Sequence, residues 1–164
     1  MCEWDRLVPT MTRAFAALLV LPALAFAQDK EDHAIGTWRF LPELSTYVSA
    51  PAPKESIREW RKAGDGKVTF LHNGTSAAGK PFHTEFTAAY DGKPYPFKGG
   101  TLYNSVALTW KSPDKVEQVF RKDDKVTVRA TRTISKDGRR MFIDSQGSMP
   151  DGRKFQNLLY YERQ

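Results

Sequence analysis

Short runs of alternating apolar and polar residues fill the chain from residue 35 onward, and clusters rich in Gly, Asp and Lys separate them. The runs recur every 8–12 residues or so, roughly the spacing of strands in sandwiches and barrels, and they are rich in Thr, Val, Phe and Tyr. Gly and Asp supply the positive φ values of tight hairpins, so each cluster predicts a turn. The clusters lie at residues 64–67, 78–80, 91–94, 112–115, 123–125, 136–139 and 150–153.

This pattern predicts ten strands and one helical turn, the turn lying within 42–47. The strands are expected at 35–41, 56–62, 67–73, 82–90, 95–98, 101–111, 115–121, 125–134, 140–147 and 153–162. Short turns would join them into a meander, and an antiparallel sheet of this size protects its edges best by closing on itself. We therefore expect one all-β domain over 35–164, an antiparallel up-and-down β-barrel of about 8–10 strands.

Alternation along each strand predicts which side chains face the barrel interior, because successive side chains point to opposite sides. No long helix is expected that could cover the sheet, so the apolar faces must point inward. On the 125–134 strand this face carries Val126, Val128, Ala130, Arg132 and Ile134. The other interior sets are Val68, Phe70 and His72; Phe82, Thr84, Phe86, Ala88 and Tyr90; Leu102, Asn104, Val106, Leu108 and Trp110; Val116, Gln118 and Phe120; and Phe155, Asn157, Leu159 and Tyr161.

Arg132 is the unusual member of these sets, because a charge in the interior must be paired or reach solvent. One interpretation makes it the anchor for the anionic head group of a ligand, with Tyr161 as a further hydrogen-bond donor. The other places its head at the barrel rim or pairs it with a structural acid. The sequence leaves both interpretations open.

The first 27 residues predict export. A basic residue at Arg13 precedes an apolar run over 15–27 that ends in Ala25-Phe26-Ala27. A basic start, about 7–15 apolar residues and a small-x-small ending describe a secretory signal peptide. A transmembrane helix would need about 20 apolar residues, and Pro22 shortens this run further.

We expect translation to start at Met11. Glu3 and Asp5 would cancel the positive charge that a signal peptide carries before its apolar run. Cleavage after residue 27 would leave Gln28 first, at the head of a flexible, charged segment over 28–34. We expect a periplasmic or secreted protein.

Cysteine content and charge narrow the chemistry. Cys2 is the only cysteine and lies before Met11, so the exported domain would have no disulfide and no thiol chemistry. The net charge is +6, but no basic run is concentrated enough to form a stripe. We take the charge first as a source of solubility, and second as a long-range attraction for anionic ligands or surfaces.

Gly36-Thr37-Trp38-Arg39-Phe40 resembles the opening of the calycin superfamily, which includes the lipocalins and the intracellular fatty-acid-binding proteins. Both families begin with Gly-x-Trp, in which the Trp closes one end of the barrel, so the resemblance implies structural roles for Gly36 and Trp38. Tyr160-Tyr161-Glu162-Arg163 is similar to the end of the fatty-acid-binding proteins. With Pro-Ala-Pro-Lys at 51–54 and repeated Asp-Gly-Lys turns, the chain is most similar to exported bacterial proteins called lipocalin-like.

Two departures limit what the resemblance implies. Fatty-acid-binding proteins carry an Arg two residues before the last-strand Tyr, and the matching pair here is Leu159 and Tyr161, so their carboxylate clamp is not carried over. They also insert a helix-turn-helix lid after the first strand, and residues 42–55 are too short and proline-rich for one. The mouth must be built differently, or side chains fill the interior.

Catalytic signatures are absent from the sequence, which has no Gly-x-Ser-x-Gly elbow, no His-Glu-x-x-His and no phosphate loop. His72 and His83 lack the paired spacing of metal ligands, and the Asp residues concentrate at turns. We therefore expect no enzyme, no metal and no other cofactor. Trp60 and Tyr90 among basic residues suggest a single-strand nucleic-acid surface, but export argues against a nucleic-acid partner.

The leading hypothesis is a noncatalytic, monomeric barrel that holds a small hydrophobic or amphipathic molecule, including an anionic one, for transport, scavenging or storage. A mostly apolar cavity with a few polar groups is typical of such sites. The alternative is a filled barrel whose outer face binds a protein or the cell envelope, and an enzyme on the same barrel is a third, less favoured hypothesis. The expected interior ligand-binding residues are Arg132, Tyr161, Asn104, His72, Gln118, Phe86, Leu108, Val128 and Leu159.

Overall fold

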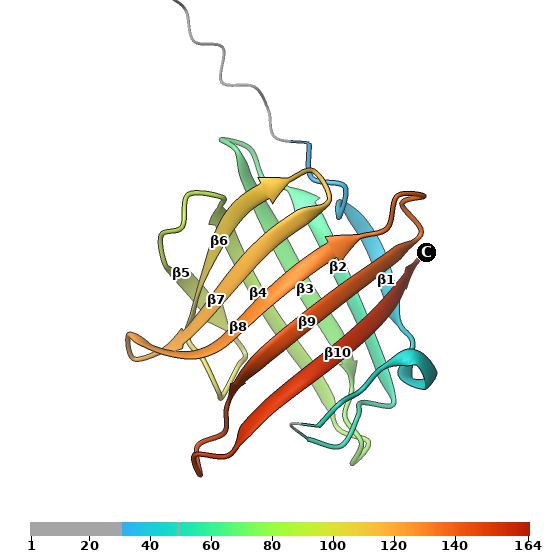
Figure 1. Cartoon of the computed structure of the whole chain (residues 1–164), viewed down its shortest axis with the longest axis vertical. Helices are drawn as coiled ribbons and strands as arrows, with labels where there is room; N and C mark the ends of the chain where they lie inside the picture. The colour runs from blue at the N-terminus through green and yellow to red at the C-terminus, as the bar shows by residue number, and fades with distance from the viewer. Residues whose placement is uncertain (1–30, 49) are drawn as a thin grey trace, which may run out of the picture.

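Ten antiparallel strands close into one barrel in the computed structural model, which describes residues 31–48 and 50–164. Each strand pairs with its neighbours along the chain, and β1 (Gly36–Phe40) also pairs with β10 (Lys154–Arg163), which closes the ring (Figure 1). The predicted up-and-down barrel is confirmed. The remaining strands are β2 (Glu55–Lys62), β3 (Lys67–Thr75), β4 (Pro81–Ala89), β5 (Tyr95–Lys98), β6 (Ser105–Ser112), β7 (Lys115–Lys122), β8 (Lys125–Ile134) and β9 (Arg140–Ser148).

The strand bounds follow the turn pattern closely, and β5 and β8 begin and end where the sequence predicts. The largest difference is β6, which begins at Ser105 and not at residue 101. Between β1 and β2 the chain forms a single 3₁₀ turn, η1 (Pro42–Leu44), where the sequence predicts one helical turn. This turn and the segment after it lie at the opposite end of the barrel from residues 31–35 (Figure 1).

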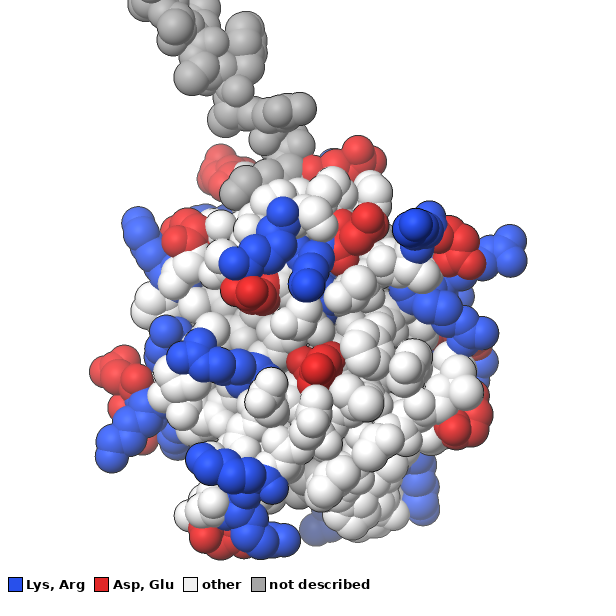
Figure 2. All heavy atoms as spheres, viewed as in Figure 1, with Lys and Arg blue, Asp and Glu red and all other residues white. Residues whose placement is uncertain are grey.

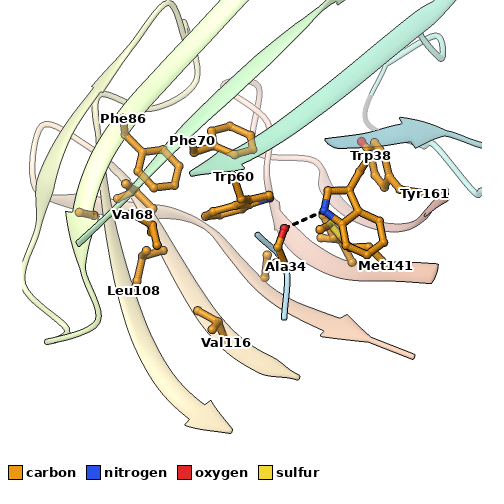
Figure 3. Packing of buried hydrophobic residues seen from close by; sticks show 14 of the residues in the cluster. Ala34, Trp38, Trp60, Val68, Phe70, Phe86, Leu108, Val116, Met141 and Tyr161 are labelled. Carbon is orange, nitrogen blue, oxygen red and sulfur yellow. Dashed lines mark hydrogen bonds between the residues drawn. The ribbon is translucent and has the colours of Figure 1, made fainter. Parts of the chain in front are cut away.

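Trp38 anchors the end of the barrel at which residues 31–35 lie, which we call the closed end. Its ring is fully buried beside Met141 and Tyr161, and its Nε1 donates to the carbonyl of Ala34 at 2.7 Å (Figure 3). The guanidinium of Arg163 covers the ring at 4.3 Å from the centroid. The predicted structural role of Trp38 therefore has a physical basis in burial, a hydrogen bond and a cation–π contact.

Gly36, for which the resemblance implied a structural role, has a backbone conformation that favours glycine. Its φ is +131°, a region that residues with a side chain rarely adopt. A Cβ at this position would also lie 2.6 Å from Nη1 of Arg163, which donates at 2.8 Å to the carbonyl of Ile35. Glycine therefore lets the chain turn into β1 directly beneath the Arg163 side chain.

The segment before β1 is built into the closed end. Asp32 and Ala34 are 3% and 0% exposed, and the backbone N–H of His33 donates to the carbonyl of Pro113 at 3.0 Å. Residues 32–34 of the segment expected to be flexible therefore pack against the barrel. The reason is the buried Asp32 carboxylate, which the polar character of the segment did not reveal.

The predicted signal peptide over 1–27, with its start at Met11 and its cleavage before Gln28, lies outside the described residues. None of the residues that the structure describes belongs to a helix with the length and apolar character needed to cross a membrane.

Candidate functional site

The barrel interior holds a cavity of three adjoining lobes. The largest, which we call the entrance lobe, has a volume of about 330 Å³. A second, the deep lobe, measures about 110 Å³, and a third measures about 30 Å³. Arg58 and Tyr103 line all three. The lobes therefore form one site arranged around these two side chains.

The mouth of the entrance lobe lies at the end of the barrel opposite Trp38. Its rim comes from three connections: Tyr47, Ala50, Pro51 and Pro53 after η1, Ser76 and Ala77 in the β3–β4 turn, and Gly99 to Leu102 before β6. Prolines restrict the first of these connections, because each fixes its own φ and biases the residue before it. The mouth is thus built from short loops, as the absence of room for a helical lid predicts.

Arg58 supplies the charge of the site. It belongs to β2, where Ser56 and Trp60 on either side are 2% and 1% exposed, so alternation points all three side chains inward. No described residue pairs with its guanidinium, and its Nε is buried without a hydrogen-bond partner. Among the described residues that line the lobes, Arg58 is the only Lys, Arg, Asp or Glu, and His72 is the only histidine. The sequence analysis missed this residue, although the inward Trp60 two positions later was the signal that could have found it.

Aromatic rings hold the Arg58 side chain in place. Its Cζ lies 4.7 Å from the ring centroid of Tyr161 and 5.8 Å from that of Phe70. Cation–π contacts of this kind offset part of the cost of removing a guanidinium from water, but they leave its N–H donors free. The side chain is therefore positioned to bind an acceptor from outside the protein.

His72 and Thr84 continue the polar level that Arg58 begins, because the three residues lie opposite one another across β2, β3 and β4. The His72 ring shares a 2.7 Å hydrogen bond with the Ser56 hydroxyl. Burial, reinforced by the charge of Arg58, holds the pKa of His72 well below its usual range, so the ring is neutral near pH 7. The hydroxyl of Thr84 is buried without a partner among the described residues.

Two tyrosine hydroxyls add uncharged donors. Tyr103 and Tyr161 both line the entrance lobe, and neither hydroxyl forms a hydrogen bond with a described residue. Burial raises the pKa of Tyr103, which keeps its hydroxyl protonated. Guanidinium and hydroxyl donors therefore line one cavity, and no carboxylate of a described residue accepts from them.

The apolar part of the site is mainly aromatic. Trp60, Phe70, Phe86 and Phe97 lie at one level across β2 to β5, with adjacent ring centroids 4.7, 4.9 and 5.8 Å apart. Figure 3 shows the first three of these rings in contact inside the wall. The level borders the third lobe and forms the floor of the site.

Arg132 does not line the cavity. Its side chain is fully buried toward the closed end, where Nη2 donates to both carboxylate oxygens of Asp32 at 2.6 and 2.7 Å. Asp32 also accepts from the Tyr90 hydroxyl and from the backbone N–H of Ala34, and the guanidinium lies 4.3 Å from the Trp60 ring centroid. The ligand-anchor interpretation of Arg132 is wrong, and the pairing with a structural acid is what the chain uses.

Asn104 is exposed and lies outside the barrel, so its predicted interior position is also wrong. It precedes β6, and its amide and carbonyl exchange hydrogen bonds of 2.8 and 3.2 Å with Asp123 in the β7–β8 turn. Val126 is turned outward as well, with 44% exposure. A β-bulge near Phe120 places Val126 opposite the outward Arg121 and breaks the alternation that continues correctly from Val128.

The other predicted site residues divide into two groups. Six line the lobes, and Leu108 is fully buried in the core without lining any of the three. The six are Tyr161 and His72 in the entrance lobe, Val128 and Leu159 in the deep lobe, Phe86 in the third lobe, and Gln118 in the deep and third lobes. The alternation of side chains along the strands therefore identified six residues of the lining, but it did not identify the charged residue, Arg58.

Over residues 31–48 and 50–164, no three His, Cys, Asp or Glu side chains gather in a way that could hold a metal ion. On the face drawn in Figure 2, Lys and Arg side chains are interspersed with Asp and Glu and do not gather in one area. On that face the charge therefore has no single focus.

Comparison with known proteins finds solved structures that share this architecture. No family model matches the chain, and no curated protein matches its sequence. Among solved structures, a variant of the fluorescent protein UnaG matches with a TM-score of 0.51 and 14% identity, over 79% of this chain and 94% of that one. The zebrafish ileal bile-acid-binding protein, solved with cholic acid, matches with a TM-score of 0.50 and 13% identity, over 81% of this chain and all of that one.

The fold is that of the calycins. Identities this low carry the shared architecture and not the ligand, so the chemistry of the site must be argued from Arg58 and its neighbours. Among the residues described, a single 3₁₀ turn is the only helical element between β1 and β2.

Proposed function

We propose that this calycin-fold protein binds a small, anionic, amphipathic molecule inside its barrel, without catalysis. The observation that carries the proposal is Arg58, a cation in the cavity with no counter-ion among the described residues. A desolvated guanidinium requires acceptors, and a carboxylate, sulfonate or phosphate group provides two in parallel. The hydroxyls of Tyr103 and Tyr161 add donors on the same side.

The cavity favours this function over the filled barrel considered from the sequence. Small-molecule sites occupy about 300 Å³ or more and are mostly apolar with a few polar groups. The entrance lobe alone measures about 330 Å³, and its remaining lining includes Pro51, Phe82 and Leu102. A ligand with its apolar body in this lobe and its anionic end at Arg58 would match both the apolar and the cationic parts of the lining. Ligand-binding barrels such as the bile-acid-binding protein share the architecture, which is consistent with this proposal.

The test compares two fluorescent probes that share one ring system, the anionic anilinonaphthalene sulfonate and the neutral N-phenylnaphthylamine. Arg58→Met retains most of the side-chain volume and removes the charge. Hydrogen bonds to charged groups contribute about 1.5–3 kcal/mol, so the affinity for the anionic probe should fall about ten- to a hundredfold. The affinity for the neutral probe should change little.

Arg61→Met is the matched control, because Arg61 lies on the same strand, is exposed and pairs with Glu59 at 2.5 Å. It should leave both affinities unchanged. Circular dichroism and thermal melting establish that each variant is folded. Equal losses for both probes in Arg58→Met would assign Arg58 to the barrel's stability, and failure of the native protein to bind either probe would reject the proposal.

We also propose that the protein is exported, because of the pattern of its first 27 residues. The apolar run before Ala27 supports a cleaved signal peptide, and the ligand would then be bound in the periplasm or outside the cell. N-terminal sequencing of the protein from its producing cell should give Gln28 or a close neighbour. An intact N-terminus on cytosolic protein would contradict export without affecting the cavity.

A further inference from the structure

A second polar level lies in the barrel wall around the deep lobe. Gln118 of β7, Ser145 of β9 and Asn157 of β10 are 4%, 8% and 5% exposed. Gln118 lies opposite Ala130 of β8, Ala130 lies opposite Ser145, and Ser145 lies opposite Asn157. Directly opposite residues share one face of a sheet, so this register carries four inward side chains around one level of the barrel.

Hydrogen bonding within the protein accounts for Asn157 in this level, but not for Gln118 and Ser145. The Asn157 carbonyl oxygen accepts from the backbone N–H of Val48 at 2.7 Å and so ties the mouth segment to β10. The side chains of Gln118 and Ser145 make no hydrogen bond with a described residue. Both line the deep lobe, where their polar atoms face its volume. These two polar side chains therefore face the lobe without a protein partner, in a wall where apolar residues would need none.

Ala130 makes the space that these groups face. As the smallest side chain in the level, it leaves a lobe of about 110 Å³ between Gln118 and Ser145. That volume holds a few non-hydrogen atoms, and it is about a third of the entrance lobe. Arg58 borders both lobes. A ligand whose anionic group meets Arg58 and whose apolar body fills the entrance lobe can therefore send only a short branch into the deep lobe.

We infer that the ligand is an amphipathic anion that carries a hydroxyl or keto group close to its charged end. The inference rests on the proposed function and assigns the deep lobe as a subsite for that substituent. Gln118 offers it a donor and an acceptor, and Ser145 offers a hydroxyl that serves as either. An anionic group held by Arg58 brings the neighbouring atoms of the ligand beside the deep lobe, because Arg58 borders both lobes.

Displacement of bound anilinonaphthalene sulfonate by decanoate, 2-hydroxydecanoate and 3-hydroxydecanoate tests the inference. The native protein should bind at least one hydroxy acid about three- to tenfold more tightly than decanoate, the difference that one or two neutral hydrogen bonds produce. Gln118→Leu and Ser145→Ala should each reduce this preference and leave the affinity for decanoate nearly unchanged. Arg58→Met should weaken all three acids by a similar factor.

Gln146→Leu is the matched control, because Gln146 follows Ser145 on β9 and is exposed. It should keep the preference of the native protein. Three equal affinities in the native protein would overturn the inference and leave the proposed function standing, as would a preference that survives both Gln118→Leu and Ser145→Ala. Failure of the native protein to bind any of the three acids would reject the proposed function and this inference together. Ser145→Ala removes a single oxygen atom, so its folding should be safe if Gln118→Leu proves unstable.

Discussion

Replacing Asp32 with alanine leaves the Arg132 guanidinium buried without a counter-ion. The two side chains are 1% and 0% exposed, and the carboxylate accepts from Arg132, Tyr90 and the Ala34 N–H. Two unit charges about 4 Å apart attract by roughly 4 kcal/mol at an effective dielectric constant of 20. Removing one partner of a buried pair costs about 3–5 kcal/mol, because the other charge stays desolvated. We expect Asp32→Ala to lower the free energy of unfolding by that amount.

Urea unfolding followed by tryptophan fluorescence measures this cost directly, since Arg132 lies against the Trp60 ring. The double variant Asp32→Ala with Arg132→Met should recover more than half of the loss, because it removes the stranded charge and keeps a side chain over Trp60. Asp114→Ala is the control, since Asp114 pairs with His33 in an exposed ion pair that contributes at most about 1 kcal/mol. A loss below about 1 kcal/mol in Asp32→Ala would refute the assignment of Asp32 to the closed end.

Trp38→Ala should lower the free energy of unfolding by about 3–5 kcal/mol, because it empties a fully buried site. The same urea titration measures this loss, and an unchanged midpoint would contradict the role of Trp38 at the closed end. His72 should make stability depend on pH. Its folded pKa lies well below 6.5, through burial and then the charges of Arg58 and His83, so the unfolded chain binds the proton first. The free energy of unfolding should therefore fall as the pH drops from about 7 to 5, and His72→Gln should flatten that decline; an equal slope in both proteins would assign it to other groups.

The strands of this barrel were predictable because turn chemistry is local. Gly and Asp at the hairpins mark the ends of β5 and β8 in the sequence itself, and closure follows from the need to protect a sheet's edges. Inward faces were predictable wherever the alternation is unbroken. It fails at Val126, where the bulge opposite Phe120 inserts one extra residue, and at Asn104, which lies before β6 begins. Neither feature has a sequence signal that alternation alone can detect.

The charged part of the site was assigned to the wrong arginine for a physical reason. Arg132 and Arg58 both occupy inward positions, and what separates them is a partner that lies elsewhere in the chain. Asp32 is 100 residues from Arg132 and comes before the first strand, in a segment whose composition is typical of a solvated terminus. Which buried cation is neutralised, and which is left for a ligand, depends on that tertiary contact.

Closure between β1 and β10 also sets the order in which the chain can fold. Arg163 donates to the carbonyls of Ile35 and His33, so the last strand completes the structure that surrounds Trp38. A chain emerging from the ribosome can form its hairpins one after another, but the first strand has an open edge until the tenth is made. Contacts of such sequence separation form slowly. Native packing at the closed end, around Trp38 and Arg163, therefore waits until the tenth strand completes the barrel.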